Sequence, residues 1–396
     1  MRLATANSFD NGLENLFKRQ SQLSSLQEQL STGKKVNRAS DDPTGTAQAE
    51  RAMTRLSRID TDQRALELQR NAIGTAESAL GNATALMQNF RELVIAAGDA
   101  AYNPRDRASL AQQLTGLRDQ ILTLANSADS NGIPVFGGLG SSSTPYIDLS
   151  SGVTFQGTAG QRATSATALP GTMNGQAIWM DVPSGNGTFK VGLNAANTGT
   201  AWTDPGTVVS PTALTGNSYS ITFNVVAGVT RYDVVNSTTG ATVATGQPYT
   251  DGAAIQFNGM SVIVHGTPQN ADAIDIAPST PGNVFQVLDD AIASIDNKPG
   301  DNKLAQSLAL SLAQVDGAFQ RLQSARSQAG DWLNRADTIT NAQSANAIAL
   351  EADKSRAVNL DLVKGLSDFN LTQTGYQAAL QSYAQIQKLS LFNFIN

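Results

Sequence analysis

Apolar residues recur at steps of three and four along both ends of the chain. In the N-terminal part this series is Ile73, Ala76, Leu80, Ala83, Met87, Phe90, Val94 and Ala97. The spacing repeats about every 3.5 residues, the period of a helix that packs along one seam against another helix. We therefore predict helices through most of residues 1–130. Asp42–Pro43 and Asn103–Pro104 each place a capping residue before a proline at the first helical position.

A matching stripe occurs in the C-terminal part. Its members are Leu308, Leu312, Val315, Phe319, Leu322, Ala329, Leu333 and Ala336. Arg326 interrupts one seam position. A helix with one apolar stripe has to bury it against another helix. We predict that helices fill about 283–396, that the two ends of the chain pair, and that the middle is an insertion.

Shorter stripes lie close to each end of the chain. They comprise Leu13, Leu16, Leu23, Leu26 and Leu30, and then Leu362, Leu366, Phe369, Tyr376, Leu380, Tyr383, Leu391 and Phe392. For residues 73–97 and 308–336 we interpret the stripes as a core within one subunit. At the chain ends such a core is hardest to complete, and short helices are marginal alone. We therefore predict that the terminal stripes form a subunit interface.

The periodicity changes between about 133 and 282. Residues 153–156 and 219–225 alternate apolar and polar side chains, as half-buried strands do. Asn258–Gly259 lies between two strand-like runs, which is a strong hairpin signal. The predicted fold is mainly α with an inserted β domain. The expected parts are a terminal helical domain (1–45 with 362–396), a second helical domain (46–170 with 283–361, with a hairpin near 133–160), and an outer β-rich domain (171–282).

Composition excludes several classes of protein. The 396 residues include no Cys and one His, so disulfide frameworks and thiolate metal sites are excluded. A net charge of −6 argues against a nucleic-acid partner. No run approaches the roughly 18 apolar residues of a membrane span. The first residues lack the basic-then-apolar layout of a cleaved secretory signal, which leaves the cytoplasm and signal-free export both open.

Candidate chemistry is sparse. Gly33–Lys34 lacks the upstream glycine and the following Ser or Thr of a phosphate loop. His265 alone supplies neither a metal cluster nor a catalytic pair. Asp251, Asp272 and Asp275 lack the spacing of a calcium loop. We expect no catalytic, cofactor-binding or metal-binding residues.

One long motif identifies a family. Residues 30–45, LSTGKKVNRASDDPTG, resemble the N-terminal signature of the flagellin superfamily. The matching positions are Gly33, Lys34, Asn37, Asp41, Asp42 and Pro43. The segment 131–138 (NGIPVFGG) and the ending 390–395 (SLFNFI) resemble the hook–filament junction branch of that superfamily, and 321–332 is similar to its C-terminal helix.

The resemblance implies a structural role outside the cell. Such proteins are exported unfolded through the flagellar channel without a cleaved signal, and they stack in a helical lattice at the hook–filament junction. The terminal helices would form the inner wall of the tube and the β domain would face outward. The implied partners are further copies of the chain, a neighbouring hook-associated junction protein, flagellin and a flagellar export chaperone.

Two other interpretations stay open at this point. A filament flagellin would share the signature, although the ending and the Phe136–Gly137–Gly138 turn favour the junction branch. A secreted coiled-coil adhesin or translocator could use the Thr-rich β domain to bind a surface. The Asp41–Asp42–Pro43 motif argues against that class, and an enzyme within the insertion has no candidate catalytic pair.

Overall fold

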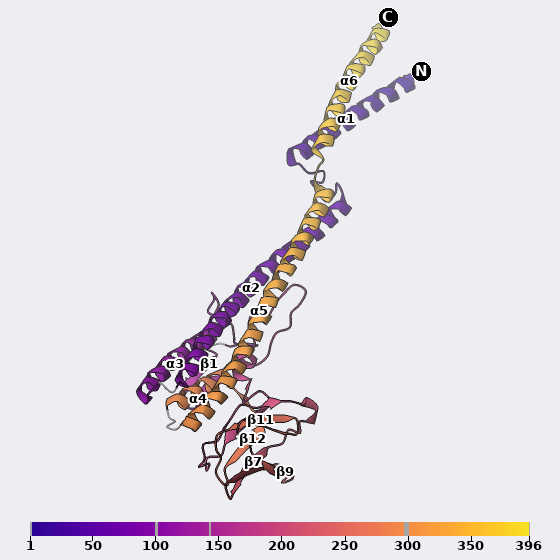
Figure 1. Ribbon diagram of the computed structural model, residues 1–396. Coiled ribbons are helices and arrows are strands. Elements are labelled where there is room, and N and C mark those ends of the chain that lie inside the picture. The colour runs from indigo at the N-terminus through magenta and orange to yellow at the C-terminus, as the bar shows by residue number, and fades with distance from the viewer. Residues whose placement is uncertain (1, 100–101, 142–143, 297–300, 396) are drawn as a thin grey trace. The chain divides into compact units, whose positions relative to one another are not determined.

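The computed structural model describes residues 2–99, 102–141, 144–296 and 301–395. The side chains of residues 2–9, 296, 301–303 and 386–395 lie outside that description. The helices are α1 (Arg2–Thr32), α2 (Pro43–Ala97), α3 (Pro104–Ala125), α4 (Val284–Asp296), α5 (Asp301–Val358) and α6 (Leu362–Ile395) (Figure 1). The chain divides into two compact units: a first unit, 1–64 with 340–396, and a second unit, 65–339.

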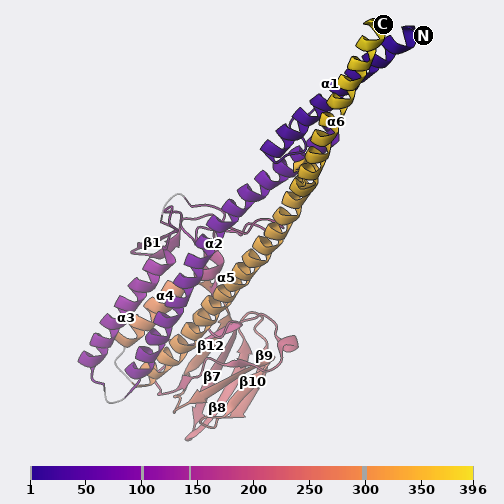
Figure 2. The same ribbon diagram turned by 90° about the horizontal axis from the view of Figure 1, so that it is seen from above.

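The first unit contains α1, α6, the start of α2 and the end of α5. Helices α1 and α6 pack against each other, and in Figure 1 they cross and diverge toward the two termini. Figure 2 shows the same pair turned by 90°. Ala49 and Ala52 on α2 and Ala357 on α5 are buried. Small side chains allow close approach of two helices, but they remove little apolar surface from water. None of the described helices combines the length and apolar character that crossing a bilayer requires.

The second unit contains the main helical core. All eight α2 residues of the predicted stripe, from Ile73 to Ala97, are 0% exposed. On α5, Val315, Leu322, Ala329 and Ala336 are equally buried. Ion pairs between described side chains join the two helices: Arg70–Asp337, Arg91–Asp316 and Arg326–Glu77. The predicted pairing of the two ends of the chain is confirmed.

The seam on α5 is rotated from the predicted one. Ser311, Ala318 and Ala325 are buried, whereas the predicted seam passed through Leu312, Phe319 and the interrupting Arg326. The small residues let α5 approach its neighbours closely, while the larger Leu312 and Phe319 pack at the border of the core. Arg326 therefore does not interrupt the seam. It lies beside the seam and pairs with Glu77 at 2.7 Å.

An aromatic cluster in the second unit packs against the hairpin formed by β1 (Tyr146–Leu149) and β2 (Gly152–Phe155). The Trp179 and Phe285 rings stack at 5.9 Å, and Tyr146 lies at 6.3 Å from Trp179 and 6.0 Å from Phe285.

Ion pairs from one arginine also hold the hairpin in place. The buried Arg118 of α3 pairs with Asp148 of β1 and with Asp289 of α4. These carboxylates raise the pKa of Arg118 above its usual value, so the guanidinium stays charged.

The β insertion lies between the hairpin and α4. Its strands are β3 (Val182–Pro183), β4 (Phe189–Leu193), β5 (Trp202–Thr203), β6 (Thr207–Val208), β7 (Tyr219–Val226), β8 (Val229–Asn236), β9 (Thr242–Pro248), β10 (Ala254–Phe257), β11 (Met260–His265), β12 (Ala273–Pro278) and β13 (Pro281–Gly282). One sheet has the order β4-β12-β7-β8-β9, and a smaller one the order β10-β11-β5 with β6 also on β11. Phe223, Val262 and Ile274 are fully buried in the core of this insertion.

The predicted hairpin in the insertion is present. Asn258 and Gly259 connect β10 to β11 with φ of 43° and 80°. Both values lie in the left-handed region, which a tight two-residue hairpin turn requires and which Asn and Gly adopt most easily. The predicted fold, mainly α with an inserted β domain, is confirmed.

Candidate assembly site: the terminal helices and the signature turn

The predicted interface residues of α1 are divided between buried and exposed positions. Leu16 is buried, Leu23, Leu26 and Leu30 are half-buried, and Leu13 is 41% exposed. Part of this stripe packs on α6. A methyl group at Gly12 would lie 3.5 Å from the Tyr383 ring, so the two helices approach closely there.

The predicted residues of α6 are more exposed. Leu362, Leu366 and Leu380 expose 58%, 54% and 43% of their surface. Phe369, Tyr376 and Tyr383 are half-buried. The side chains of Leu391 and Phe392 lie outside the described residues. The pairing of α1 with α6 therefore leaves much of the predicted stripe in contact with water.

Several exposed apolar side chains were missed because they do not follow the predicted stripes. They are Phe17 at 62%, Val363 at 82% and Leu371 at 75% exposure. Single exposed apolar residues are normal on a protein surface, but a concentration of them indicates an interaction surface. A broader apolar face than the narrow seam assumed from the sequence is thus available on the terminal helices.

The signature turn lies where the chain passes between the two helix pairs of the first unit. Gly33 ends α1 with φ of 68°, a left-handed conformation that favours glycine. Lys34 then forms an isolated antiparallel bridge with Asn359, between α5 and α6. Two backbone hydrogen bonds close it: the Lys35 amide donates to the Val358 carbonyl, and the Leu360 amide to that of Gly33, both at 2.9 Å. The two connections of the unit are therefore joined to each other.

The polar residues of the signature hold the turn in shape. The Asp41 carboxylate accepts hydrogen bonds from the backbone amides of Asn37 and Arg38, at 3.1 and 2.8 Å. The Asn37 side-chain oxygen accepts one from the Thr32 hydroxyl at 2.8 Å. These bonds satisfy backbone amides of the turn itself and join the turn to the last residue of α1.

Asp42 and Pro43 start α2. Asp42 Oδ1 accepts hydrogen bonds from the Gly45 amide at 2.9 Å and the Thr44 hydroxyl at 2.7 Å. These bonds, that of Gly45 first, lower the pKa of Asp42 below its ordinary value. Pro43 occupies the first helical position, where no amide donor is needed. A Cβ on Gly45 would lie 2.5 Å from Oδ2 of Asp42 and 3.1 Å from the Ala357 carbonyl oxygen. Any other residue here would therefore displace the capping carboxylate and crowd the approach of α2 to α5.

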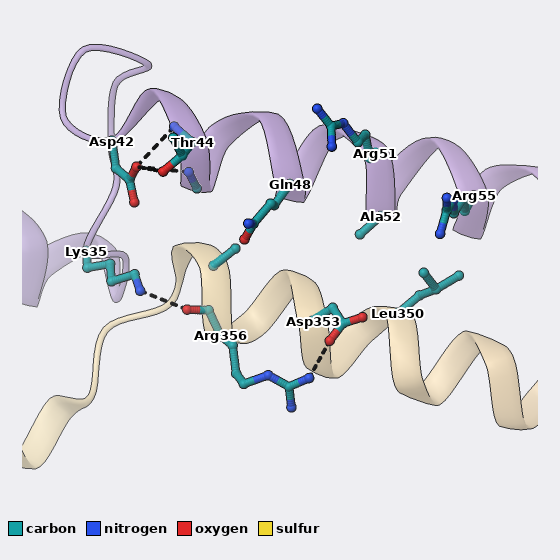
Figure 3. Close-up of a pocket in the computed structure, with 12 residues that line it drawn as sticks. Lys35, Asp42, Thr44, Gln48, Arg51, Ala52, Arg55, Leu350, Asp353 and Arg356 are labelled. Carbon is teal, nitrogen blue, oxygen red and sulfur yellow. Dashed lines mark hydrogen bonds and ion pairs between the residues drawn. The ribbon is translucent and has the colours of Figure 1, made fainter.

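Beside the turn, α2 and α5 border a groove of about 500 Å³ (Figure 3). Lys35, Arg51, Arg55 and Arg356 contribute positive charge to its lining. The Lys35 ammonium donates to the Arg356 carbonyl at 2.8 Å, and the Arg356 guanidinium pairs with Asp353. This arrangement of cations suits the binding of carboxylates.

The residues considered for chemistry have structural surroundings. His265 stacks on Trp202 at 4.7 Å and lies 3.7 Å from Asp251. The Asp272 carboxylate accepts hydrogen bonds from the amides of Thr198 and Gly199, which fixes a loop of the insertion. Among the described residues no group of His, Asp and Glu side chains could hold a metal ion.

Two family models match the two end regions of the chain. Residues 4–141 match the bacterial flagellin N-terminal helical region, and residues 312–395 match the bacterial flagellin C-terminal helical region. Together these regions make up more than half of the chain. The chain belongs to the flagellin superfamily.

Within the flagellin superfamily the similarity to hook-associated proteins is full-length. Flagellar hook-associated protein 3 of Salmonella typhimurium is 23% identical over 399 residues, covering 99% of each chain. The crystal structure of flagellar hook associated protein-3 from Legionella pneumophila has a TM-score of 0.73 and 27% identity, over 78% of this chain and 98% of that one. The crystal structure of Xanthomonas campestris FlgL has a TM-score of 0.70 and 27% identity, over 78% of this chain and 99% of that one.

The residues of the superfamily signature have structural roles in this chain. Gly33, Asn37, Asp41, Asp42 and Pro43 all act in helix termination, turn formation or helix capping. The chain is a structural, non-enzymatic component of the flagellum. Sequence reasoning missed Asn359, because its partner Lys34 is more than 300 positions away in the chain. It also missed Gly45, whose Cβ would meet both the capping Asp42 side chain and the distant Ala357 carbonyl.

Proposed function

We propose that this chain is a structural subunit of the flagellar hook–filament junction that acts outside the cell by stacking with other subunits. The observation that carries the proposal is the end-to-end similarity to hook-associated protein 3, which covers 99% of both chains. A filament flagellin shares the terminal helical regions, so the terminal regions alone do not separate the two roles.

The terminal helices form the assembly surface in this proposal. Leu13, Leu362, Leu366 and Leu380 expose large apolar surfaces although α1 and α6 already pack on each other. Burying a large aliphatic side chain contributes about 1.5–3 kcal/mol. Contacts with neighbouring subunits would bury these side chains. Head-to-tail contact between unlike surfaces propagates into a tube instead of closing as a dimer.

In this proposal, three parts of the chain form three layers of the assembled tube. Residues 1–45 with 362–396 form the inner wall, residues 46–170 with 283–361 a second layer, and residues 171–282 an outward-facing β domain. The proposed partners are further copies of the chain, a neighbouring hook-associated junction protein, flagellin, and an export chaperone that acts before export.

A clean gene deletion tests the proposed role. We expect complete hooks without filaments in electron micrographs, together with flagellin monomers in the culture medium, because the filament has no junction on which to assemble. Expression of the full chain from a plasmid should restore filaments and motility. Hooks without any flagellin in the cell or medium would identify the chain as the filament subunit, and unchanged motility would contradict a flagellar role.

A further inference from the structure

Charge is unevenly distributed between the two units. Residues 1–64 and 340–396 contain 14 Lys and Arg against 12 Asp and Glu. Residues 65–339 contain 13 Lys and Arg against 21 Asp and Glu. The first unit is therefore slightly basic and the second strongly acidic, a contrast that the overall charge of −6 conceals.

A row of arginines concentrates the positive charge of the first unit. Arg51, Arg55 and Arg58 follow one another on α2 at steps of four and three, so they lie on one face of the helix. All three are exposed, and among the described residues none lies within 4 Å of a carboxylate. Like charges at this spacing destabilise an isolated helix. By contrast, Arg64 on the same helix pairs with Asp60 at 2.6 Å. The row itself forms no ion pair within the described part of the monomer.

Two of the three arginines border the groove beside the signature turn (Figure 3). Arg51 and Arg55 line this groove, and the buried Ala52 lies between them. The two aspartates of the lining are already engaged, because Asp42 caps α2 and Asp353 pairs with Arg356. The guanidinium groups of Arg51 and Arg55 are thus free to bind carboxylates of another molecule in a partly enclosed site.

We propose that the arginine row Arg51, Arg55 and Arg58 binds the acidic second unit of another copy of this chain in the assembled junction. The proposal rests on the proposed function, since it requires copies to stack. Opposite charges on two different units make head-to-tail contact complementary, and they disfavour contact between two first units. The charge difference would therefore set the direction in which copies add.

A charge reversal tests the row. In the full chain, Arg51→Glu with Arg55→Glu should leave the melting temperature of the secreted monomer unchanged or raised, because it removes repulsion. It should lower the number of copies retained on isolated hooks about tenfold, which corresponds to about 1.4 kcal/mol. Unchanged retention would overturn the proposal.

The matched control is Arg162→Glu with Arg231→Glu, which changes the net charge equally with two exposed arginines of the second unit. We expect near-normal retention for this variant. Equal losses in the two variants would show an effect of net charge alone, and that outcome would also overturn the proposal. A deletion strain with normal filaments would instead remove the proposed function itself, so the two failures are distinguishable.

Photocrosslinking identifies what lies in the groove. A benzophenone amino acid at Gln48, which lines the groove and leaves the arginines intact, is activated in intact flagella. We expect a dimer of the chain with the attachment point, mapped by mass spectrometry, within residues 65–339 of the second copy. Attachment to flagellin, to another junction protein or to the first unit of a second copy would overturn the proposal.

Discussion

Asp42 shows at the scale of one residue how the signature acts. Its carboxylate accepts the Gly45 amide and the Thr44 hydroxyl, and these bonds lower its pKa in the folded chain. A group with a depressed folded pKa contributes stability above its unfolded pKa, about 4, and loses it as the pH falls through the folded value. We therefore expect the melting temperature to fall below about pH 4, and to fall less in Asp42→Asn.

The measurement is a series of thermal melts followed by circular dichroism. Asp62→Asn is the control, since Asp62 lies on the same helix and has no hydrogen-bonding partner in the described part of the chain. A pH dependence that is the same in both variants would contradict the capping role of the Asp42 charge.

Gln343 is a second residue whose surroundings predict a measurable effect. It is 6% exposed on α5, and neither its side-chain oxygen nor its nitrogen has a hydrogen-bond partner among the described residues. An unsatisfied buried polar group costs about 1–3 kcal/mol. We expect Gln343→Leu to raise the free energy of unfolding by about 1–3 kcal/mol in urea titrations. Gln328→Leu, at an exposed position of the same helix, should change it by less than about 0.5 kcal/mol.

At the scale of helices, apolar spacing predicted which elements pair but not their rotation. Every predicted residue between Ile73 and Ala97 is fully buried. On α5 the pattern favoured Phe319, yet the buried neighbour is Ala318. A period near 3.5 allows adjacent stripes, and hydrophobicity alone favours the larger side chain. In the structure, close packing against the partner helix places the small Ala318 in the core. That choice depends on the partner helix, so the local sequence of α5 does not predict it.

The signature turn shows a similar division. Its glycine, capping aspartates and proline are local signals, so their positions could be predicted from the sequence. The bridge between Lys34 and Asn359 could not be predicted, because a pair of backbone hydrogen bonds between distant segments leaves no residue pattern. Likewise, the exposure of Phe17 and Leu371 depends on how α1 and α6 pair.

The terminal helices should be the least stable elements of the monomer. They bury Leu16 but expose Phe17, Leu366 and Leu371, so their apolar contacts are incomplete. Elements with few buried contacts open at low free energy and are cleaved first. We expect limited proteolysis of the monomer to trim both ends to a stable core of roughly 45–360, identified by mass spectrometry. A full-length monomer that resists cleavage would contradict incomplete packing of α1 and α6.

At the scale of the whole molecule, folding and assembly should depend on different apolar residues. Leu80 is fully buried in the core of the second unit, whereas Leu380 is 43% exposed on α6. Removing a buried leucine side chain costs about 2–5 kcal/mol through lost burial and the cavity left behind. An exposed leucine leaves no such cavity, so its truncation has little effect on the monomer. In an assembly that buries Leu380, the same truncation weakens the contact between subunits.

We therefore expect Leu380→Ala, and similarly Phe369→Ala, to reduce filament formation and motility while the melting temperature of the monomer changes by only a few degrees. Leu80→Ala should show the reverse, with a large loss of monomer stability. The two measurements are thermal melts of purified protein and electron microscopy of complemented deletion strains. If Leu380→Ala and Leu80→Ala destabilise the monomer equally, α6 belongs to the core of one subunit, and the assembly surface has to lie elsewhere on the chain. If Leu380→Ala affects neither property, its exposed side chain is not part of the interface.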